Sequence, residues 1–156
     1  MAIENKATDV ITGKKNDPEA TKEALEDGWL KTGDLVRQDE NGYLFIEGRI
    51  KNIILLKNGE NIVPESIEEK FYQNPLVRDC LVKPVKVNGE EVVGIEILPR
   101  MESFQGDDAA AIQQKLQALV NEVNTQLPPY ARIINMKIRT EDFKRTGALK
   151  VDRKNS

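Results

Sequence analysis

Three Asn-Gly pairs, at 41–42, 58–59 and 88–89, interrupt short alternations of apolar and polar residues along the chain. Asn-Gly readily takes the positive φ angles of tight turns, and such a pair between two alternating stretches is typical of a β-hairpin. Two such stretches, 77–87 and 91–98, flank the third pair. The pattern therefore predicts a hairpin at each of the three places.

Apolar residues that recur at intervals of three and four predict helices elsewhere in the chain. The clearest stripe runs through 107–126, and a shorter one occupies 64–73. An Asp-Pro start predicts a further helix over 17–25, and an apolar run at 133–138 predicts a last strand. This order indicates a small α+β domain, in which a β-hairpin and a mostly antiparallel three-stranded sheet are packed by helices.

The chain divides near residues 49–52. One hairpin and one helix cannot bury a core alone, so we interpret residues 1–49 as the end of a larger domain. Residues 50–156 have the size of a small domain that folds by itself. The first 16 residues are polar and lack periodicity, and we expect loop or disorder there.

Composition excludes several classes of function. The chain has 156 residues, 31% of them charged, and a formal net charge of −3, which argues against a nucleic-acid-binding face. It contains no histidine and one cysteine, so Ser-His and Cys-His catalysis are excluded and we expect no metal site. Any chemistry must come from Lys, Arg, Asp and Glu.

The same counts bear on location. No apolar run approaches the ~20 residues of a membrane span, and the N-terminus has no secretory pattern. The lone Cys80 excludes an internal disulfide, and its strand-like surroundings favour a packed core thiol over a nucleophile. We therefore expect a cytoplasmic protein without a transmembrane segment.

Three motifs carry a resemblance to a known superfamily. They read WLKTGDL at 29–35, GRIKN at 48–52 and NGENIVPESIE at 58–68. In this order they resemble successive motifs of the AMP-forming adenylating enzymes, which include acyl-CoA synthetases, firefly luciferase and peptide-synthetase adenylation domains. The NGENI run is most similar to long-chain fatty-acid CoA ligases. The chain would then be the C-terminal domain of such an enzyme, preceded by a hairpin from its large domain.

The first two motifs supply Asp34 and Arg49. The hairpin between them returns Arg49 toward the end of the sheet where Asp34 starts a strand. The resemblance implies that Asp34 binds the ribose hydroxyls of ATP or acyl-adenylate and that Arg49 contacts the ribose or a nearby phosphate. A carboxylate suits this task because it accepts two hydroxyl donors. The alternatives are a surface-turn aspartate and a solvated strand-end arginine.

Three further residues follow from the resemblance. Lys51 matches the hinge at which the small domain rotates between two working orientations; from spacing alone it would be an exposed edge charge. Gly59 and Asn61 match the loop that lines the pantetheine path of CoA in the thioester-forming orientation. The alternative for this loop is a plain turn without a binding role.

The run FKRTGALKVDR at 143–153 is similar to the C-terminal motif of the superfamily. The resemblance implies that Lys150 is the catalytic lysine that reaches the adenylation site and stabilises charge on the carboxylate and α-phosphate. The usual upstream proline and the glycine before the lysine are absent here. The alternative is a basic, frayed end of the chain.

The implied parent enzyme activates a carboxylic acid, in this case a fatty acid, to acyl-AMP and then to acyl-CoA. Its cofactors and substrates are ATP/AMP, coenzyme A and Mg, bound mainly by the large N-terminal domain. No Ser/Thr/Gly-rich phosphate loop occurs in this chain, so we predict that it is inactive alone. Two alternatives stay open: a non-catalytic interaction module, and an adenylation fragment that serves a carrier protein.

Overall fold

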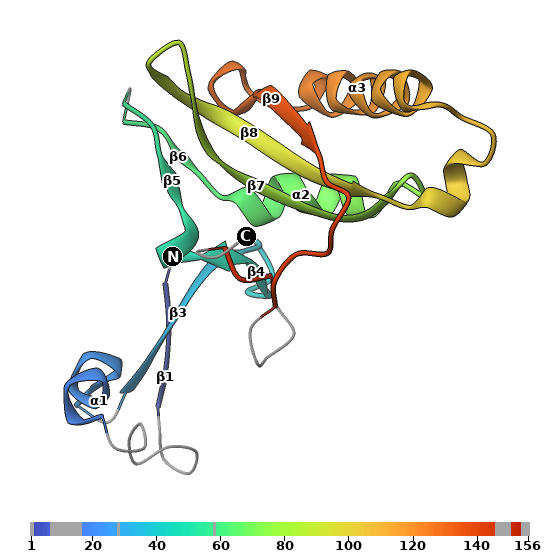
Figure 1. Cartoon of the computed structure of the whole chain (residues 1–156). Coiled ribbons are helices and arrows are strands. Elements are labelled where there is room, and N and C mark those ends of the chain that lie inside the picture. Colours follow the sequence, from blue (N-terminus) through green and yellow to red (C-terminus); the bar gives the residue numbers. More distant parts are fainter. Residues whose placement is uncertain (1, 7–16, 28, 58, 146–150, 154–156) are drawn as a thin grey trace. The chain divides into compact units, whose positions relative to one another are not determined.

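The computed structural model shows two compact units, Met1–Ile53 and Ile54–Ser156 (Figure 1). It describes residues 2–6, 17–27, 29–57, 59–145 and 151–153. The boundary between the units falls after Ile53, one residue beyond the stretch 49–52 where the sequence predicts a division. That the first unit is the end of a larger domain stays a prediction.

The first unit is organised around one central strand, β3 (Trp29–Gln38), with which every other strand of the unit pairs antiparallel. The remaining elements are β1 (Ala2–Lys6), α1 (Pro18–Ala24), β2 (Leu25–Glu26), β4 (Leu44–Arg49) and the 3-10 turn η1 (Ile50–Asn52). Asp17 caps α1 by accepting the backbone N–H of Ala20 at 2.9 Å. The predicted helix at this place is confirmed.

Residues 2–6 differ from the expectation of loop or disorder. They form β1, which runs beside β3 with Ala2 opposite Leu35 and Lys6 opposite Trp29 (Figure 1). Backbone hydrogen bonds make this pairing, and they need no apolar alternation in the paired segment. The partner lies more than twenty residues further along the chain, so local periodicity carries no sign of it. The rest of the polar start, 7–16, lies outside the described residues.

The turn between β3 and β4 forms where the first Asn-Gly pair predicts it. The Asp39 carboxylate accepts the backbone N–H groups of Asn41 and Tyr43, each at 2.9 Å. Gly42 follows with φ of +87°, a conformation that glycine takes without strain. The side chain of Asp39 thus fixes the turn that aligns β3 with β4.

The second unit contains a three-stranded sheet with the order β7-β8-β9. Strands β7 (Val77–Val87) and β8 (Glu90–Pro99) are antiparallel, and β9 (Ile133–Ile138) is parallel to β8. Asn88 and Gly89 both have positive φ, as a two-residue hairpin turn of this kind requires. The other elements are β5 (Ile54–Leu55), β6 (Asn61–Ile62), α2 (Pro64–Tyr72), η2 (Met101–Phe104), α3 (Ala109–Thr125) and η3 (Pro129–Ala131).

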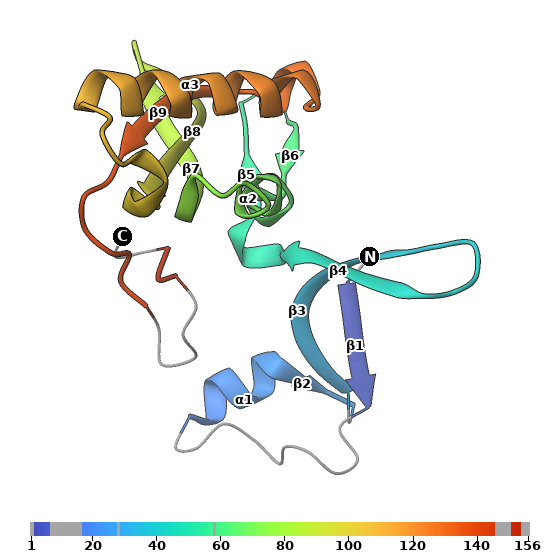
Figure 2. The same ribbon diagram turned by 90° about the vertical axis from the view of Figure 1, so that its right-hand side faces the viewer.

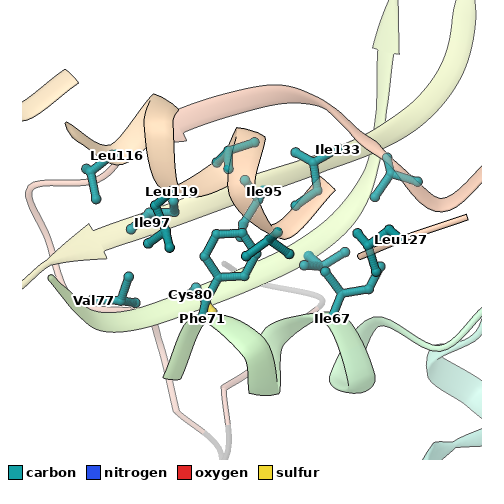
Figure 3. Packing of buried hydrophobic residues seen from close by; sticks show 14 of the residues in the cluster. Ile67, Phe71, Val77, Cys80, Ile95, Ile97, Leu116, Leu119, Leu127 and Ile133 are labelled. Carbon is teal, nitrogen blue, oxygen red and sulfur yellow. The ribbon is translucent and has the colours of Figure 1, made fainter. Parts of the chain in front are cut away.

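Both long helices of this unit pack on one face of the sheet (Figures 2 and 3). Ile67 and Phe71 from α2 meet Leu116 and Leu119 from α3 over the sheet residue Ile95 (Figure 3). Side chains alternate along a strand, so the neighbours of these core residues face the other side. There a smaller cluster forms from Leu81, Leu98 and Phe143, with Val151 packed against it.

The predicted fold class is confirmed: a small α+β domain with a hairpin, a mostly antiparallel sheet and covering helices. Within the described ranges, no helix combines the length and apolar character that a membrane crossing needs. Cys80 lies buried in β7, as predicted for a core thiol. Burial raises the pKa of this thiol, and the nearby Glu68 and Asp79 carboxylates raise it further, so it stays protonated.

Candidate functional site

Asp34 and Arg49 lie directly opposite each other on β3 and β4. The Nε atom of Arg49 is 3.0 Å from Oδ1 of Asp34, and the two side chains are 40% and 20% exposed. The sequence predicts this proximity, and the structure confirms it. A carboxylate has about four acceptor positions, so this one ion pair leaves capacity for hydroxyl groups of a ligand. The role of the pair in ribose binding stays a prediction.

Local backbone features shape this pair. Gly33 has φ of +72°, which a larger residue would take only with strain, and it turns the chain immediately before Asp34. The N–H of Asp34 then donates to the Thr32 hydroxyl at 3.2 Å. On the opposite strand the register shifts by one residue, which leaves Glu47 as a β-bulge next to the pair. Bulges of this kind commonly redirect a side chain beside a site.

Lys51 lies in the middle of η1, with its side chain exposed. The turn is closed by the N–H of Ile53, which donates to the carbonyl of Ile50 at 3.2 Å. The boundary between the two units falls directly after Ile53. A short turn at such a boundary can absorb changes in backbone dihedrals, which is what a hinge requires. The hinge role of Lys51 stays a prediction.

Gly59 and Asn61 belong to the small hairpin β5–β6 of the second unit. Gly59 has φ of +83° and donates its N–H to the carbonyl of Leu56 at 2.9 Å, so it closes the turn. A Cβ atom added at Gly59 would meet nothing within 4 Å. Asn61 pairs with Leu55 and is exposed. The turn geometry accounts for the glycine, and the binding role of both residues stays a prediction.

Lys150, the predicted catalytic residue, lies outside the described residues, but the residues on both sides of 146–150 are described. Arg145 and Val151 form an antiparallel bridge. Next to it, the N–H of Asp152 donates to the carbonyl of Lys144 at 2.7 Å. The described residues that flank this segment therefore lie side by side.

Arg153, after this segment, joins a buried group of atoms at the edge of the sheet. Its Nη2 atom is 2.5 Å from Oε2 of Glu68, and its Nη1 atom donates to the carbonyl of Val82 at 3.0 Å. The other oxygen of Glu68 accepts the N–H of Val82 at 2.7 Å. Arg153, Glu68 and the Val82 backbone thus form a closed ring of charge-assisted hydrogen bonds.

Arg145, before the segment, pairs with the buried Asp79 of β7. The Tyr72 hydroxyl donates to the same carboxylate at 2.8 Å, and the N–H of Cys80 donates to it at 2.9 Å. Burial raises the pKa of Tyr72, and the neighbouring anionic groups raise it further, so its hydroxyl remains a donor. Asp79 therefore has donors from α2, from its own strand and from the C-terminal segment.

Sequence reasoning brought Asp34 and Arg49 together but missed the acids that hold the C-terminal segment. A signal for one of them exists. Pro64, Ile67, Glu68 and Phe71 have the spacing of one helix face, so Glu68 lies on the apolar stripe of α2. A carboxylate at such a position needs a buried partner. The alternative of a frayed basic end is wrong for Arg145 and Arg153, because both contact buried carboxylates.

The described residues contain no group of three His, Cys, Asp or Glu side chains placed to hold a metal ion. In the first unit, the Asp34–Arg49 pair fits the hydroxyl and phosphate groups of a nucleotide, since it offers acceptors and a cation together. In the second unit, the acids near the C-terminal segment already accept hydrogen bonds from protein donors. Nucleotide binding by the Asp34–Arg49 pair stays a prediction.

Comparison with known proteins places these features in one family. The chain is similar to the sulfoacetate–CoA ligase of Cupriavidus necator, with 39% identity over 104 residues that make up 65% of this chain and 20% of the relative. A long-chain-fatty-acid–CoA ligase of Mycobacterium tuberculosis is 37% identical over 97 residues, 62% of this chain and 16% of the relative. The chain thus spans about a fifth or less of the length of these relatives.

A solved structure gives the same fold. The o-succinylbenzoate CoA synthetase of Bacillus subtilis, in complex with its acyl-adenylate intermediate, superposes with a TM-score of 0.72 at 23% identity, and the match covers 93% of this chain and 28% of the synthetase. The sequence model of a protein family, the AMP-binding enzyme C-terminal domain, matches residues 51–156. This match extends over more than half of the chain, which therefore belongs to the family of C-terminal domains of AMP-forming adenylating enzymes.

Proposed function

We propose that this chain is the C-terminal part of an acyl-CoA synthetase that activates a fatty acid in the cytoplasm. The observation that carries the proposal is the Asp34–Arg49 pair, formed across β3 and β4 immediately before the domain that the family model matches. The resemblance of the NGENI run supports a long-chain acid, and a long-chain-fatty-acid–CoA ligase is among the relatives. The relative that is named for sulfoacetate makes a different acid the main rival.

The parent reaction has two steps. The acid's carboxylate attacks the α-phosphorus of ATP, which releases pyrophosphate and forms acyl-AMP. The thiol of CoA then attacks the acyl carbonyl, loses its proton, and releases AMP. Lys150 stabilises the charge on the carboxylate and α-phosphate in the first step. Asp34 accepts hydrogen bonds from the ribose hydroxyls, and Arg49 holds the Asp34 carboxylate in place and meets the neighbouring phosphate.

The small domain acts in both steps by changing its orientation. Rotation at Lys51, in η1, replaces the Lys150 segment by the hairpin that carries Gly59 and Asn61. That hairpin then lines the path of the pantetheine arm of CoA. A carrier protein with the same arm is the alternative acceptor. Mg would be held mainly by the large domain, where it would shield the phosphate charges of ATP.

The exposed apolar surface of the first unit supports the proposal that this unit contacts a large domain. Four consecutive side chains, Tyr43 to Ile46, are exposed at the turn and along β4. Exposed apolar stretches of this kind commonly mark an interface. Since the chain spans about a fifth or less of its relatives, the large domain is the partner that we propose for this surface. A separate protein partner, bound by a non-catalytic module, is the second candidate for the same surface.

The proposal is tested by ATP–pyrophosphate exchange with a panel of fatty acids and sulfoacetate. The chain alone is compared with the chain mixed with the separately produced large domain of its enzyme. We expect no exchange with the chain alone, because no phosphate loop occurs in its sequence, and exchange in the mixture with a long-chain acid. Exchange with sulfoacetate alone would identify the rival acid. A folded mixture that is inactive with every acid would favour the interaction module.

A further inference from the structure

Two arginines at the end of the chain reach acids that lie far away in the sequence. Arg145 pairs with Asp79, 66 residues earlier, and Arg153 pairs with Glu68, 85 residues earlier. Both acids are buried, at the edge strand β7 and on the adjoining helix α2. The five residues 146–150 lie between the two arginines. The described residues on both sides of that segment are therefore tied to the body of the second unit.

The contact of Arg153 fixes direction as well as distance. Its guanidinium donates to the Glu68 carboxylate and to the Val82 carbonyl with different nitrogens, and it lies 3.5 Å from a carboxylate oxygen of Glu65. A planar guanidinium that donates to two fixed acceptors has little freedom to rotate. Lysine, a single charge on a flexible stem, would not reproduce both contacts.

Apolar packing and backbone pairing support the two ion pairs. Phe143 and Val151 pack with Leu81 and Leu98 on the face of the sheet away from the helices. The backbone bridge between Arg145 and Val151 joins the first ion pair to the residues that precede Arg153. Val151, the residue after Lys150, is thus held by a backbone bridge, by apolar contacts and by its proximity in the chain to Arg153.

We propose that Arg145 and Arg153 are positioning residues, which fix the described residues on both sides of 146–150 to the second unit and on which the contribution of Lys150 to adenylation depends. The proposal rests on the proposed function and deepens it. All of the contacts lie within the second unit. We call the two ion pairs, Arg145–Asp79 and Arg153–Glu68, the clamp. The clamp therefore moves with the small domain in both orientations. It acts only in the step that uses Lys150, which is formation of acyl-AMP.

A matched control exists in the same region. Arg78, also on β7, pairs with Asp142 of the C-terminal segment at 3.1 Å, but both side chains are more than half exposed. This pair joins the same two parts of the chain without a buried acid and without flanking residues 146–150. Arg78→Met removes a cation and an ion pair as Arg145→Met and Arg153→Met do, but it leaves the clamp intact.

The first measurement uses the chain alone. Hydrogen exchange followed by mass spectrometry reports the protection of backbone amides in a peptide that covers 144–153. We expect Arg145→Met and Arg153→Met each to increase exchange in this peptide by about tenfold or more beyond any increase in β8, which reports global unfolding of the unit. Arg78→Met should leave the peptide unchanged. Unchanged exchange in both clamp variants would overturn the proposal, whether or not the enzyme activates fatty acids.

The second measurement separates the two half-reactions in the chain mixed with its large domain. In Arg145→Met and Arg153→Met, we expect kcat for acyl-AMP formation to fall about 100-fold, since a catalytic group displaced by about 1 Å loses that much. KM for ATP should stay within about twofold, because only transition-state stabilisation is lost. Thioester formation from supplied acyl-AMP should also stay within about twofold of the unmodified rate.

Arg153→Lys keeps the charge but not the double contact, so it should recover only part of the adenylation rate and thereby distinguish orientation from charge. If Lys150→Ala abolishes adenylation while both clamp variants keep it, the positioning proposal is wrong and the proposed function stands. An equal loss in both half-reactions would also overturn it, since general instability would then explain the effect. If the unmodified mixture does not adenylate any acid, the proposed function fails, and the exchange experiment still decides whether the clamp exists.

Discussion

Each unit of the molecule contains an arginine–carboxylate pair, and the two pairs lie in very different surroundings. In the first unit, Asp34 and Arg49 lie 3.0 Å apart on a hairpin, and both side chains remain in contact with solvent. In the second unit, Glu68 and Arg153 lie 2.5 Å apart, with the acid only 7% exposed and both groups also bonded to the Val82 backbone. The first pair keeps acceptor positions for a ligand. In the second pair, protein donors already occupy the acceptor positions of Glu68, and the pair holds Arg153 in place.

The difference shows that the role of an ion pair follows from its surroundings rather than from the distance between its charged atoms. An exposed pair contributes little to stability and can exchange its partners for a substrate. A buried pair costs desolvation free energy, which is recovered only when each polar atom finds a partner. Glu68 meets that condition because Arg153 and Val82 each bond to a different oxygen. We therefore expect loss of the exposed pair to alter catalysis with little loss of stability, and loss of the buried pair to lower stability as well as catalysis.

The largest difference in stability is expected between two isoleucines. Ile97 on β8 is 0% exposed and Ile46 on β4 is 71% exposed. Ile97→Ala should lower the free energy of unfolding of the second unit by about 4 kcal/mol, because it leaves a cavity in the core. Ile46→Ala should lower that of the first unit by less than about 0.5 kcal/mol.

Urea unfolding can follow the two units separately. The fluorescence of Trp29, the only tryptophan, reports the first unit, and far-ultraviolet circular dichroism is dominated by the helices of the second. Equal effects of the two isoleucine substitutions would mean that the core of the second unit is not close-packed, and the contrast between the units would disappear.

The two arginines are expected to separate stability from activity. Arg153→Met leaves Glu68 without its cation and should destabilise the second unit by about 3 kcal/mol. Arg49→Met should cost less than about 1 kcal/mol, because its pair with Asp34 is partly exposed. It should still weaken binding of a nucleotide to the complete enzyme. Thermal unfolding and nucleotide titration measure the two effects, and a large loss of stability in Arg49→Met would contradict the comparison.

Close packing in the second unit is also tested at Gly94. A Cβ atom there would lie 2.7 and 2.8 Å from the two methyl carbons of Val85 on the neighbouring strand. Gly94→Ala should therefore destabilise the unit by about 2 kcal/mol. Adding Val85→Ala removes the clash and should restore part of the loss in urea unfolding. If the double variant is no more stable than Gly94→Ala, the strain has another origin.

The smallest expected effect concerns pH, and two buried acids should act with opposite signs. Burial raises the pKa of Glu68 above its ordinary value of 4.5, and Arg153 opposes the shift without cancelling it, while Glu65 adds to it. Burial also acts on Glu96, but hydrogen bonds from Lys83 and Arg139 and the charge of Lys137 outweigh it and lower the pKa of that carboxyl. The native state therefore holds a proton on Glu68 more tightly than the unfolded state, and one on Glu96 less tightly.

Linkage gives the direction for each group. Between pH 4.5 and the raised pKa of Glu68, the unfolded state has released the proton but the native state still holds it. The free energy of unfolding therefore falls as pH rises through this range. The stabilisation by Glu96 is lost as pH falls from 4.5 through its lowered pKa. Urea unfolding between about pH 3.5 and about pH 6.5 should show that Glu68→Gln removes the first slope and Glu96→Gln the second. Slopes of the same sign would show that one assignment is wrong.

Local sequence carried most of the fold. The Asn-Gly turn at 88–89, the stripe of α3 and the Asp17 start of α1 predicted their elements because turn chemistry and periodicity are short-range signals. Strand β1 escaped prediction because its partner β3 is distant in sequence. The parallel pairing of β8 with β9 is equally long-range, and the sequence predicted a mostly antiparallel sheet without specifying this pair.

The candidate site divides in the same way. The position of Arg49 opposite Asp34 followed from hairpin geometry, so the sequence was sufficient for this pair. The contact between Arg153 and Glu68 joins residues 85 positions apart, and no local pattern specifies that partner. What the sequence did show was a carboxylate on the apolar face of α2. It indicated that a partner was needed, but not which one.

The hydrogen bonds at Val82 have a consequence for solubility. Strand β7 is at the edge of its sheet, and Glu68 and Arg153 occupy the N–H and carbonyl groups of Val82 that would otherwise recruit another strand. A chain shortened before Arg153 would uncover the carbonyl of Val82 and the Glu68 carboxylate together. Such an open edge is a template for intermolecular β-sheet and aggregation. We therefore expect Arg153 to protect this edge from pairing with a second chain, apart from any part it takes in catalysis.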